Sequence, residues 1–371
     1  MRESFLESAL IQVIREEIQS TGGVLPFHRF MELALYAPEL GYYVQSAGRV
    51  GVDGDFYTSV RVGALLGELI GRYFSEAAAK SDEPSVLVEA GAHDGQLALD
   101  ILTYLDGWQP EIRPMLWLVE PSANRRRWQE HTLARFGGQI RWVDNLDQLL
   151  LAFPNGLSGL VYANELLDAF PVHRLRWERE TKGWLAMGVA ATSTGFHWKT
   201  LLPEAVGIQP EELPPVPPAL AEVLPDGFTT EICPLATQWW RQAARCLKQG
   251  RLLTFDYGLD DEEFFAPQRY EGTLRAYSRH RVTGQILENI GEQDLTAHVH
   301  FTKLKMAGED VGLTTEFYGG QRQWLTKRME ETLHDPNRRF PDWNSARVRQ
   351  FQTLTHPEHL GRGFRVLEQG R

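Results

Sequence analysis

Residues 86–95 constrain the fold of this chain more than any other segment. An apolar run that ends in Glu89 is followed by a turn of small residues and then by an amphipathic stretch at 96–102. This order predicts a buried parallel strand, a tight turn that lets backbone approach a ligand, and a helix N-terminus. Glu120 follows a second apolar run, 115–119, where an acidic side chain can bind the two hydroxyls of a ribose. The pattern predicts a nucleotide-type ligand at the carboxyl end of a parallel sheet.

The spacing of the glycines narrows the choice of ligand. Dinucleotide folds use G-x-G-x-x-G, whereas only Gly91 and Gly95 fall in this turn and His93 occupies the middle position. A pyrophosphate needs close backbone approach, so the spacing argues against NAD. An acid, two spaced glycines and a distant second acid favour S-adenosylmethionine. Glycine turns also follow strands that bind nothing, and that alternative stays open on this motif alone.

Composition excludes several classes of protein. The 371 residues carry a formal net charge of -11, so the global basic footprint of a nucleic-acid-binding protein is absent. Arg125, Arg126 and Arg127 are expected to form the solvated face of a helix. Only two cysteines are present, which fits a reducing compartment, and no apolar run has membrane-spanning length. An N-terminus with Glu3 and Glu7 lacks signal-peptide character, so the expected location is the cytoplasm.

Strands and helices alternate through the middle of the chain. Strands are predicted near 86–89, 115–120, 140–143, 159–163 and 251–256, with later ones near 311–318 and 364–368. Helices are predicted at 3–20, 26–36, 62–79, around 235–247, at 295–309 and onward to 355. The alternation predicts an α/β fold with a doubly wound, Rossmann-like parallel sheet.

Two insertions interrupt this alternation. Residues 172–202 alternate polar and apolar side chains and are predicted to form antiparallel hairpins. Residues 259–300 are rich in aromatics, histidine and arginine, and form either a substrate cap or a surface excursion. The predicted organisation is a helical and glycine-rich region at 1–80, a core at 81–258 with a hairpin insertion at 172–218, a cap at 259–300, and a core-completing segment at 301–371.

Carboxylates follow two of the predicted strands. Asn164, Glu165 and Asp168 come after the fourth strand, and Asp256 ends the fifth, so all four are expected at the ligand-binding edge. Two carboxylates at that place can bind a guanidinium through bidentate, charge-assisted hydrogen bonds. The alternatives are structural: Asn164 would cap a helix, and Asp256 would belong to a satisfied strand-end turn.

The histidines of the second insertion do not predict a metal site. His280, Asp294, His298 and His300 lie close in sequence, but in a helix His298 and His300 would face different sides. The sequence also lacks G-x-S-x-G, H-E-x-x-H and Walker motifs, which argues against hydrolases and kinases.

Several segments together carry a family resemblance. They are Leu35-Tyr-Ala-Pro38, Gly41-Tyr-Tyr43, Gly54-Asp-Phe-Tyr-Thr-Ser59, Asn164-Glu-Leu-Leu-Asp-Ala-Phe-Pro171, Asp256-Tyr-Gly258, Gly272-Thr-Leu-Arg275 and Asp294-Leu-Thr-Ala-His-Val299. In this order they resemble the MidA-like family of S-adenosylmethionine-dependent methyltransferases, which includes a mitochondrial complex I assembly factor that methylates an arginine.

The resemblance implies a methyltransferase core and assigns residues to its site. The cofactor-binding residues it implies are Glu89, Gly91, Gly95 and Glu120, with Gly54, Asp55, Phe56 and Thr58 in a loop over the cofactor. Asn164, Glu165 and Asp168 would face the acceptor. The implied acceptor is a protein arginine, and the implied partner is a protein substrate such as a respiratory complex subunit.

The chain departs from the family pattern at several positions. The family's first turn usually reads Gly-x-Gly-x-Gly, but here His93 stands in the middle; Val60 and Arg61 replace Pro-Glu, His300 replaces Asp, and Glu316 replaces Gln. An imidazole at position 93 could crowd the methionine end of the cofactor or point away. These differences bear on the acceptor more than on the fold.

Roles for the acceptor side follow from the chemistry of a guanidinium, which has no free lone pair. Glu165 and Asp168 would fix its plane, Asp256 would orient them, and His280 would take the proton after transfer. One alternative is a small-molecule methyltransferase with an aromatic pocket lined by Trp177, Trp184, Trp198, Tyr270 and Tyr277. The other is a non-catalytic binding or assembly protein whose His93 turn no longer holds the cofactor.

Overall fold

The computed structural model describes residues 8–45, 59–79, 83, 85–278, 281–337, 339–357, 360–361 and 363–371. The chain forms two compact units, each assembled from three segments. The core unit comprises Tyr57–Leu167, Thr237–Gly258 and Phe301–Arg371; the accessory unit comprises Met1–Phe56, Asp168–Ala236 and Leu259–His300.

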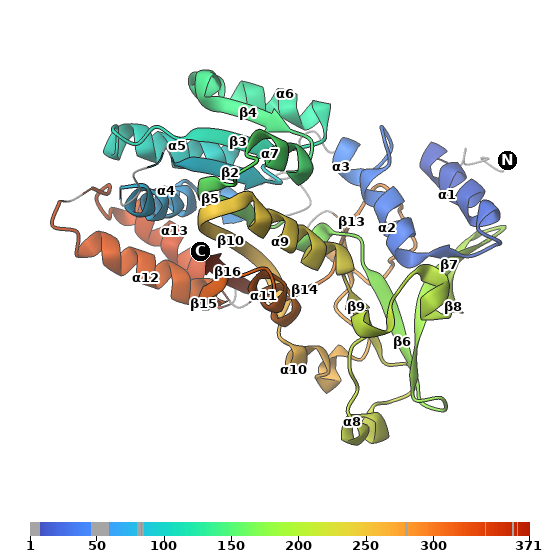
Figure 1. The fold of residues 1–371 in the computed structure, drawn as a ribbon. Coiled ribbons are helices and arrows are strands. Elements are labelled where there is room, and N and C mark those ends of the chain that lie inside the picture. The colour runs from blue at the N-terminus through green and yellow to red at the C-terminus, as the bar shows by residue number, and fades with distance from the viewer. Residues whose placement is uncertain are drawn as a thin grey trace. The chain divides into compact units, whose positions relative to one another are not determined.

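The core unit is built on a mixed sheet (Figure 1). Seven strands form its main path: β2 (Val86–Ala90), β3 (Met115–Val119), β4 (Ile140–Val143), β5 (Leu157–Asn164), β10 (Leu247–Leu259), β15 (Thr314–Gly320) and β16 (Phe364–Gly370). They pair in the order β15-β16-β10-β5-β2-β3-β4. The strands from β10 to β4 are parallel, whereas β16 is antiparallel to both β10 and β15.

The order of the strands fixes where a ligand can bind. The chain runs from β2 outward to β3 and β4, and then returns to place β5 on the other side of β2. The connections leave β2 and β5 in opposite directions, and the crevice outside their carboxyl ends is the usual ligand site of such sheets. Every residue of β2 is buried, as expected for a strand covered on both faces. The doubly wound α/β core predicted from the sequence is confirmed.

Helices cover the faces of this sheet. They are α4 (Leu65–Ala78), α5 (Gln96–Trp108), α6 (Ala123–Thr132), α7 (Leu146–Ala152), α9 (Pro234–Cys246), α11 (Phe301–Glu309), α12 (Gln321–Leu333) and α13 (Ser345–Thr355). Helices α4, α5, α12 and α13 share one hydrophobic core with the strands, and α11 packs on β15 and β16. Trp324 of α12 is fully buried, and its indole N–H donates to Glu368 of β16, 3.1 Å away. Burial of a large aromatic with its polar atom satisfied ties α12 to the sheet.

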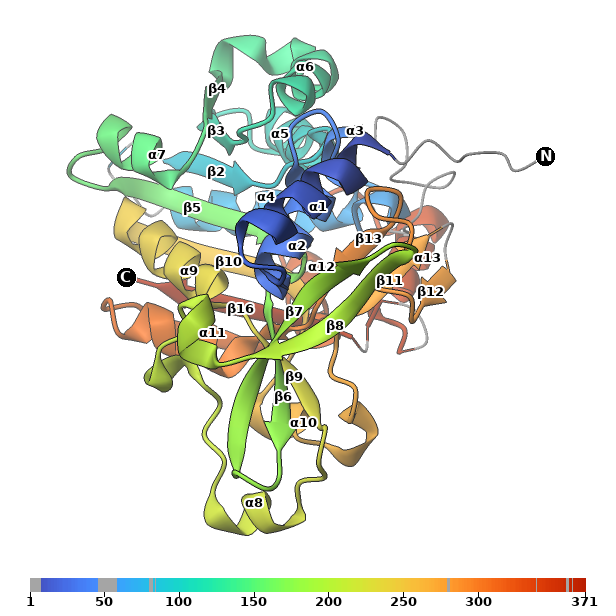
Figure 2. The same cartoon turned by 90° about the vertical axis from the view of Figure 1, so that its right-hand side faces the viewer.

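The accessory unit holds a twisted antiparallel sheet (Figure 2). Its strands are β1 (Leu25–Pro26), β6 (His173–Glu178), β7 (Gly183–Thr192), β8 (Gly195–Leu201) and β9 (Thr229–Ile232). The hairpins predicted for residues 172–202 are confirmed as β6-β7 and β7-β8. Helices α1 (Ala9–Ser20) and α2 (Phe27–Tyr36) bury their apolar faces in the same cluster as β7.

The second insertion belongs to the accessory unit as well. Strands β11 (Arg275–Ser278), β12 (Arg281–Thr283) and β13 (Asp294–Thr296) form a small antiparallel sheet. The remaining short elements of the unit are α3 (Tyr42–Gln45), α8 (Pro218–Val223), α10 (Asp261–Phe264) and β14 (Val299–His300).

Two local predictions are wrong. The helix predicted for 295–309 begins only at Phe301, because Asp294–Thr296 pairs with β11 and Val299–His300 is extended. The arginines of α6 do not form a purely solvated face, since Arg126 donates to the carbonyl of Glu120 and pairs with Asp144 at 2.5 Å.

Within the described ranges, none of the helices combines the length and apolarity that crossing a membrane would need.

Candidate functional site

The turn after β2 has an unusual backbone. Gly91, His93 and Gly95 have φ values of 73°, 48° and 87°, so three residues of the turn are left-handed. A Cβ on Gly91 would lie 2.8 Å from Cδ1 of Leu166, so the tip of that side chain would have to shift, and the positive φ would strain any residue with a side chain. Gly95 is the N-cap of α5, so the turn delivers the chain directly to a helix N-terminus. The predicted strand, turn and helix are therefore confirmed, and His93 holds a conformation that glycine adopts at lower cost.

Glu89 lies at the end of β2 and is 3% exposed. The hydroxyl of Tyr162 in β5 donates to its Oε2 at 2.9 Å. Burial raises the pKa of Glu89 to about 8, and the hydrogen bond from Tyr162 opposes the rise only in part. Near neutral pH the buried carboxyl therefore binds a proton that it would release in the unfolded chain.

This raised pKa predicts a pH-dependent contribution to stability. Between about pH 4.5 and 8 the unfolded carboxyl is ionised while the folded one keeps its proton, so the free energy of unfolding falls as the pH rises. Each unit by which folding raises the pKa corresponds to about 1.4 kcal/mol in the free energy of unfolding. Glu89→Gln has no carboxyl to titrate, so it should lack this contribution to the pH dependence. Its free energy of unfolding relative to that of the wild type should therefore increase with pH. Urea unfolding at pH 5, 6, 7 and 8 measures it, with exposed Glu111→Gln as the control; parallel curves for wild type and Glu89→Gln would refute the assignment.

Charged groups hold the start of α5. Arg61, in the 3₁₀ turn Ser59–Val62, pairs with Asp94 at 2.5 Å, and Asp94 Oδ1 accepts the backbone N–H of Gln96 at 3.2 Å. Burial opposes ionisation of Asp94, but the imidazole of His93 and the guanidinium of Arg61 outweigh it and lower the pKa of Asp94 to about 2. An ionised carboxylate at a helix N-terminus also interacts favourably with the helix dipole. Arg61, one of the departures from the family pattern, thus stabilises the turn.

Glu120 and the turn are joined by a buried glutamine. Gln129 of α6 donates to the carbonyl of His93 at 3.0 Å and to Oε2 of Glu120 at 3.4 Å, and accepts from Trp142 at 2.9 Å. The other carboxylate oxygen of Glu120 accepts the backbone N–H of Ser122 at 2.9 Å. Each carboxylate oxygen has two lone pairs, so both keep acceptor capacity for a ligand's hydroxyls. Burial raises the pKa of Glu120, although the nearby Arg125 opposes this.

Asn164 and Glu165 form a second cluster at the same edge of the sheet. Glu165 has a φ of 51°, and its Oε1 accepts from the backbone N–H of Ser59 at 3.0 Å, the hydroxyl of Ser59 at 2.7 Å and the amide of Asn164 at 3.0 Å. Burial raises the pKa of Glu165, and these three hydrogen bonds oppose the rise. Among the described residues, none donates to its Oε2. The carboxylate thus holds Ser59 through one oxygen, and its other oxygen has no donor within the described ranges.

Asp256 supports this cluster from β10. Its Oδ2 accepts the backbone N–H groups of Leu166 and Leu167 at 3.2 and 2.8 Å, and its Oδ1 accepts that of Tyr257 at 2.8 Å. The backbone N–H of Glu165 in turn donates to the carbonyl of Phe255 at 2.9 Å. Asp256 is fully buried, so its carboxylate acts on the backbone that carries Glu165.

The accessory unit contributes a separate group of carboxylates and phenols. The hydroxyl of Tyr43 reaches both oxygens of Asp294, at 2.8 and 2.9 Å. Burial, Asp294 and Asp168 raise the pKa of Tyr43, and burial, Asp168 and Asp294 raise that of Tyr277. Two buried carboxylates and two phenols therefore lie near one another and form an environment that attracts a cation.

The structure brings together part of the predicted site. Glu89, Gly91, Gly95, Glu120, Asn164, Glu165 and Asp256 lie in the core unit, and Asp168 lies in the accessory unit. His280 and the loop residues Gly54, Asp55, Phe56 and Thr58 fall outside the described residues. Sequence reasoning missed Ser59, Gln129, Tyr43 and Asp294 as site residues, although Ser59, Tyr43 and Asp294 lie within the motifs that carry the family resemblance.

The aromatic side chains proposed to line a small-molecule pocket do not share one surface. Trp177 and Trp184 are buried against each other, with ring centroids 5.1 Å apart, inside a hydrophobic cluster of the accessory unit. Trp198 packs on Phe27, and the hydroxyl of Tyr270 donates to Asp226. The two buried tryptophans are core residues, so that part of the prediction is wrong. In the described part of the chain, no three histidine, cysteine or carboxylate side chains could hold a metal ion together.

Comparisons with known proteins agree with this geometry. Residues 69–319 match the Methyltransf_28 family of S-adenosyl-L-methionine-dependent methyltransferases. "Protein arginine methyltransferase NDUFAF7, mitochondrial" of Danio rerio is 28% identical over 97% of this chain and 86% of its own. The Drosophila melanogaster homologue of that protein is 27% identical over 97% of this chain and 84% of its own.

Solved structures match over the whole fold. A COG1565 superfamily member from Burkholderia thailandensis, crystallised with S-adenosyl-homocysteine, superimposes with a TM-score of 0.80. It is 28% identical and the match covers 98% of this chain and 92% of that one. A native crystal structure of a COG1565 superfamily protein from the same organism gives a TM-score of 0.78.

The names of the relatives correct one prediction. They are mitochondrial proteins, including that of Homo sapiens, so the cytoplasmic location predicted from composition is wrong. That prediction rested on a low cysteine count and an acidic N-terminus. A low cysteine count indicates a reducing environment, but it does not identify which compartment provides it.

Proposed function

Since this chain belongs to the Methyltransf_28 family of S-adenosyl-L-methionine-dependent methyltransferases, we propose that it transfers the methyl group to a guanidinium nitrogen of a protein arginine. The observation that carries the acceptor is the similarity, over 97% of the chain, to relatives named protein arginine methyltransferases. The family resemblance further suggests a subunit of a respiratory complex as the protein that carries this arginine.

The residues at the edge of the core sheet fit the cofactor. The left-handed turn from Gly91 to Gly95 has no side chain on either glycine, so backbone can approach a ligand closely. Glu120 retains acceptor capacity for the ribose hydroxyls, and Gln129 links it rigidly to the turn. When bound, S-adenosyl-L-methionine supplies an electrophilic methyl group on a sulfonium. Glu89, Gly91, Gly95 and Glu120 are our proposed cofactor-binding residues.

The residues that would bind the methyl acceptor are proposed from the charge that a guanidinium carries. A guanidinium stays protonated because its pKa exceeds about 12, so it has no free lone pair. Carboxylates that hold its plane and draw the positive charge onto two nitrogens would leave the third nitrogen more nucleophilic. We assign this role to Glu165, whose Oε2 has no donor among the described residues, and propose Asp168 as a further acceptor-side residue; Asp256 positions the backbone beneath Glu165. An arriving cation would also favour the ionised form of Glu165, against the effect of burial.

Positioning then supplies most of the catalysis. Effective molarities of aligned reactants correspond to about 7–11 kcal/mol of the barrier when reacting atoms are held about 3–3.5 Å apart. Asp294, which accepts the hydroxyl of Tyr43, offers a second anionic group for the substrate protein's basic residues. We propose that this group contributes to recognition of the arginine-bearing protein.

Radiolabelled methyl transfer tests the proposal. The purified chain is incubated with methyl-tritiated cofactor and a mitochondrial extract, and protein is then hydrolysed to amino acids. We expect label in methylarginine, and none in methyllysine. Glu165→Gln serves as the inactive control. Label confined to low-molecular-mass products would support a small-molecule acceptor, and absence of S-adenosylhomocysteine formation would support a non-catalytic binding protein; either result would contradict the proposal.

A further inference from the structure

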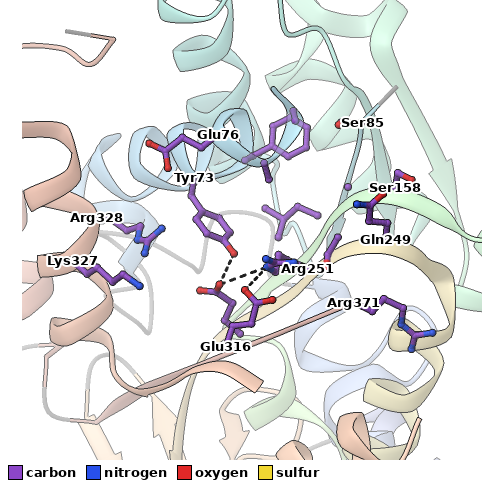
Figure 3. A pocket seen from close by; sticks show the side chains of 17 residues that line it. Tyr73, Glu76, Ser85, Ser158, Gln249, Arg251, Glu316, Lys327, Arg328 and Arg371 are labelled. Atoms are coloured by element: carbon purple, nitrogen blue, oxygen red, sulfur yellow. Dashed lines mark hydrogen bonds and ion pairs between the residues drawn. The ribbon is translucent and has the colours of Figure 1, made fainter. Parts of the chain in front are cut away.

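A cavity of about 390 Å³ lies in the core unit, at the amino ends of the parallel strands (Figure 3). Ser85 precedes β2, Ser158 and Gly159 begin β5, and Gln249 and Gly250 lie near the start of β10. The cofactor turn follows the other end of β2, whose first and fifth residues are four steps of about 3.3 Å, or about 13 Å, apart. A ligand in this cavity would therefore not overlap with the cofactor.

The floor of the cavity is bare backbone. Gly159 and Gly250 have φ values of 153° and 131°, and a Cβ on either would lie 1.9 Å from a carbonyl oxygen of the neighbouring strand. Only glycine fits there, so no side chain extends from these positions into the space above the strands.

The carboxylates of the cavity already have donors. Glu368 accepts from the hydroxyl of Tyr73 at 2.6 Å and the indole of Trp324 at 3.1 Å. Glu316 pairs with Arg251 at 2.7 Å, as Figure 3 shows, and the same guanidinium lies 3.9 Å from Oε1 of Glu368. Burial and the Glu368 carboxylate raise the pKa of Tyr73, so its hydroxyl remains a donor.

Some hydrogen-bond donors on the opposite wall have no acceptor among the described residues. Arg328 is 7% exposed, stacks on the rings of Tyr73 and Trp324 with its Cζ 5.0 and 5.3 Å from their centroids, and pairs with Glu331 at 3.1 Å. Its Nε is buried and has no hydrogen-bond acceptor among the described residues. Lys327 reaches into the same space from α12 beside Arg328, as Figure 3 shows, and forms no ion pair within the described part of the chain.

A buried guanidinium N–H without an acceptor costs free energy, which a ligand oxygen would recover. The carboxylates of the cavity have donors, whereas Nε of Arg328 and the ammonium of Lys327 have no acceptor among the described residues, so a partner would supply acceptor atoms. Arginine and lysine together favour an oxyanion, since a guanidinium offers directed donors and an ammonium a point charge. The apolar walls formed by Phe74, Leu160 and Tyr73 suit the short carbon body of an organic ion.

We propose that this cavity is a second ligand site, distinct from the methyltransferase site, for a small anion carrying a carboxylate or phosphate group bound by Lys327 and Arg328. The inference does not depend on the identity of the methyl acceptor.

Isothermal titration of the full chain with sodium succinate and, separately, with inorganic phosphate tests the proposal. The two probes distinguish a carboxylate from a phosphate source. At least one should bind with a Kd of about 1 mM or tighter. Lys327→Met should weaken that binding about fivefold, and Arg328→Gln about tenfold or more. Lys327 is exposed, so its replacement should leave the fold intact even where that of the buried Arg328 does not.

The matched control is Arg322→Met, which removes a cation from the exposed face of the same helix outside the cavity. It should change the affinity less than twofold. Binding of neither probe up to about 10 mM would overturn the proposal. Equal losses in Lys327→Met and Arg322→Met would also overturn it, because they would indicate screening of general surface charge instead of a built site.

Discussion

Gly91→Val should abolish cofactor binding while the protein stays folded. At a φ of 73° a β-branched residue is strained, and its Cβ would lie 2.8 Å from Leu166. The strained residue would distort the turn on which the proposed cofactor contacts depend. Loss of affinity for S-adenosylhomocysteine should exceed about 100-fold, equivalent to roughly 2.8 kcal/mol, measured by isothermal titration.

A second glycine provides the control for this variant. A Cβ on Gly137 would meet no heavy atom within 4 Å, and the residue has no positive φ, so Gly137→Val should bind S-adenosylhomocysteine as the wild type does. Thermal unfolding of both variants shows whether the fold is kept. If Gly91→Val bound S-adenosylhomocysteine with wild-type affinity, the turn after β2 would not be the cofactor site.

The sequence predicted the core of the fold because buried parallel strands are apolar runs. Each predicted strand from 86–89 to 251–256 is present, and the polar-apolar alternation of residues 172–202 marked the hairpins. The turn after β2 was also predictable, since glycines and a strand-end acid lie within a few residues of each other. Periodicity and turn chemistry are local properties, and sequence shows them directly.

The hydrogen-bond network that holds the site was not predictable. Gln129 bonds to a carbonyl 36 residues away, and Tyr43 bonds to Asp294 at a separation of 251 residues. Such contacts depend on how strands are ordered, and no spacing along the chain encodes them. The helix predicted for residues 295–309 failed for the same reason: pairing of β13 with β11 overrides local helix propensity.

Glu165→Gln should abolish methyl transfer while cofactor binding survives. The amide keeps an oxygen that can accept the hydrogen bonds from Ser59 and Asn164, so the local structure should persist. It removes the negative charge proposed to polarise the guanidinium. We expect kcat to fall at least about 100-fold, the size of effect seen when one electrostatic group of an active site is removed. Affinity for S-adenosylhomocysteine should change less than about threefold.

The variant Ser59→Ala distinguishes two roles for Glu165: polarising the guanidinium by its charge, or only holding Ser59 in place by hydrogen bonds. If Glu165 served only to hold Ser59, Glu165→Gln would retain activity, because its amide oxygen can replace the carboxylate, and Ser59→Ala would lose it. The charge-based proposal predicts the opposite order, with Ser59→Ala the more active variant. It also predicts that kcat/KM of the wild type falls at acidic pH with an apparent pKa above that of an ordinary glutamate, since burial raises the pKa of Glu165. Retained turnover in Glu165→Gln would assign the carboxylate to the architecture of the loop and leave Asp168 as the candidate for binding the guanidinium.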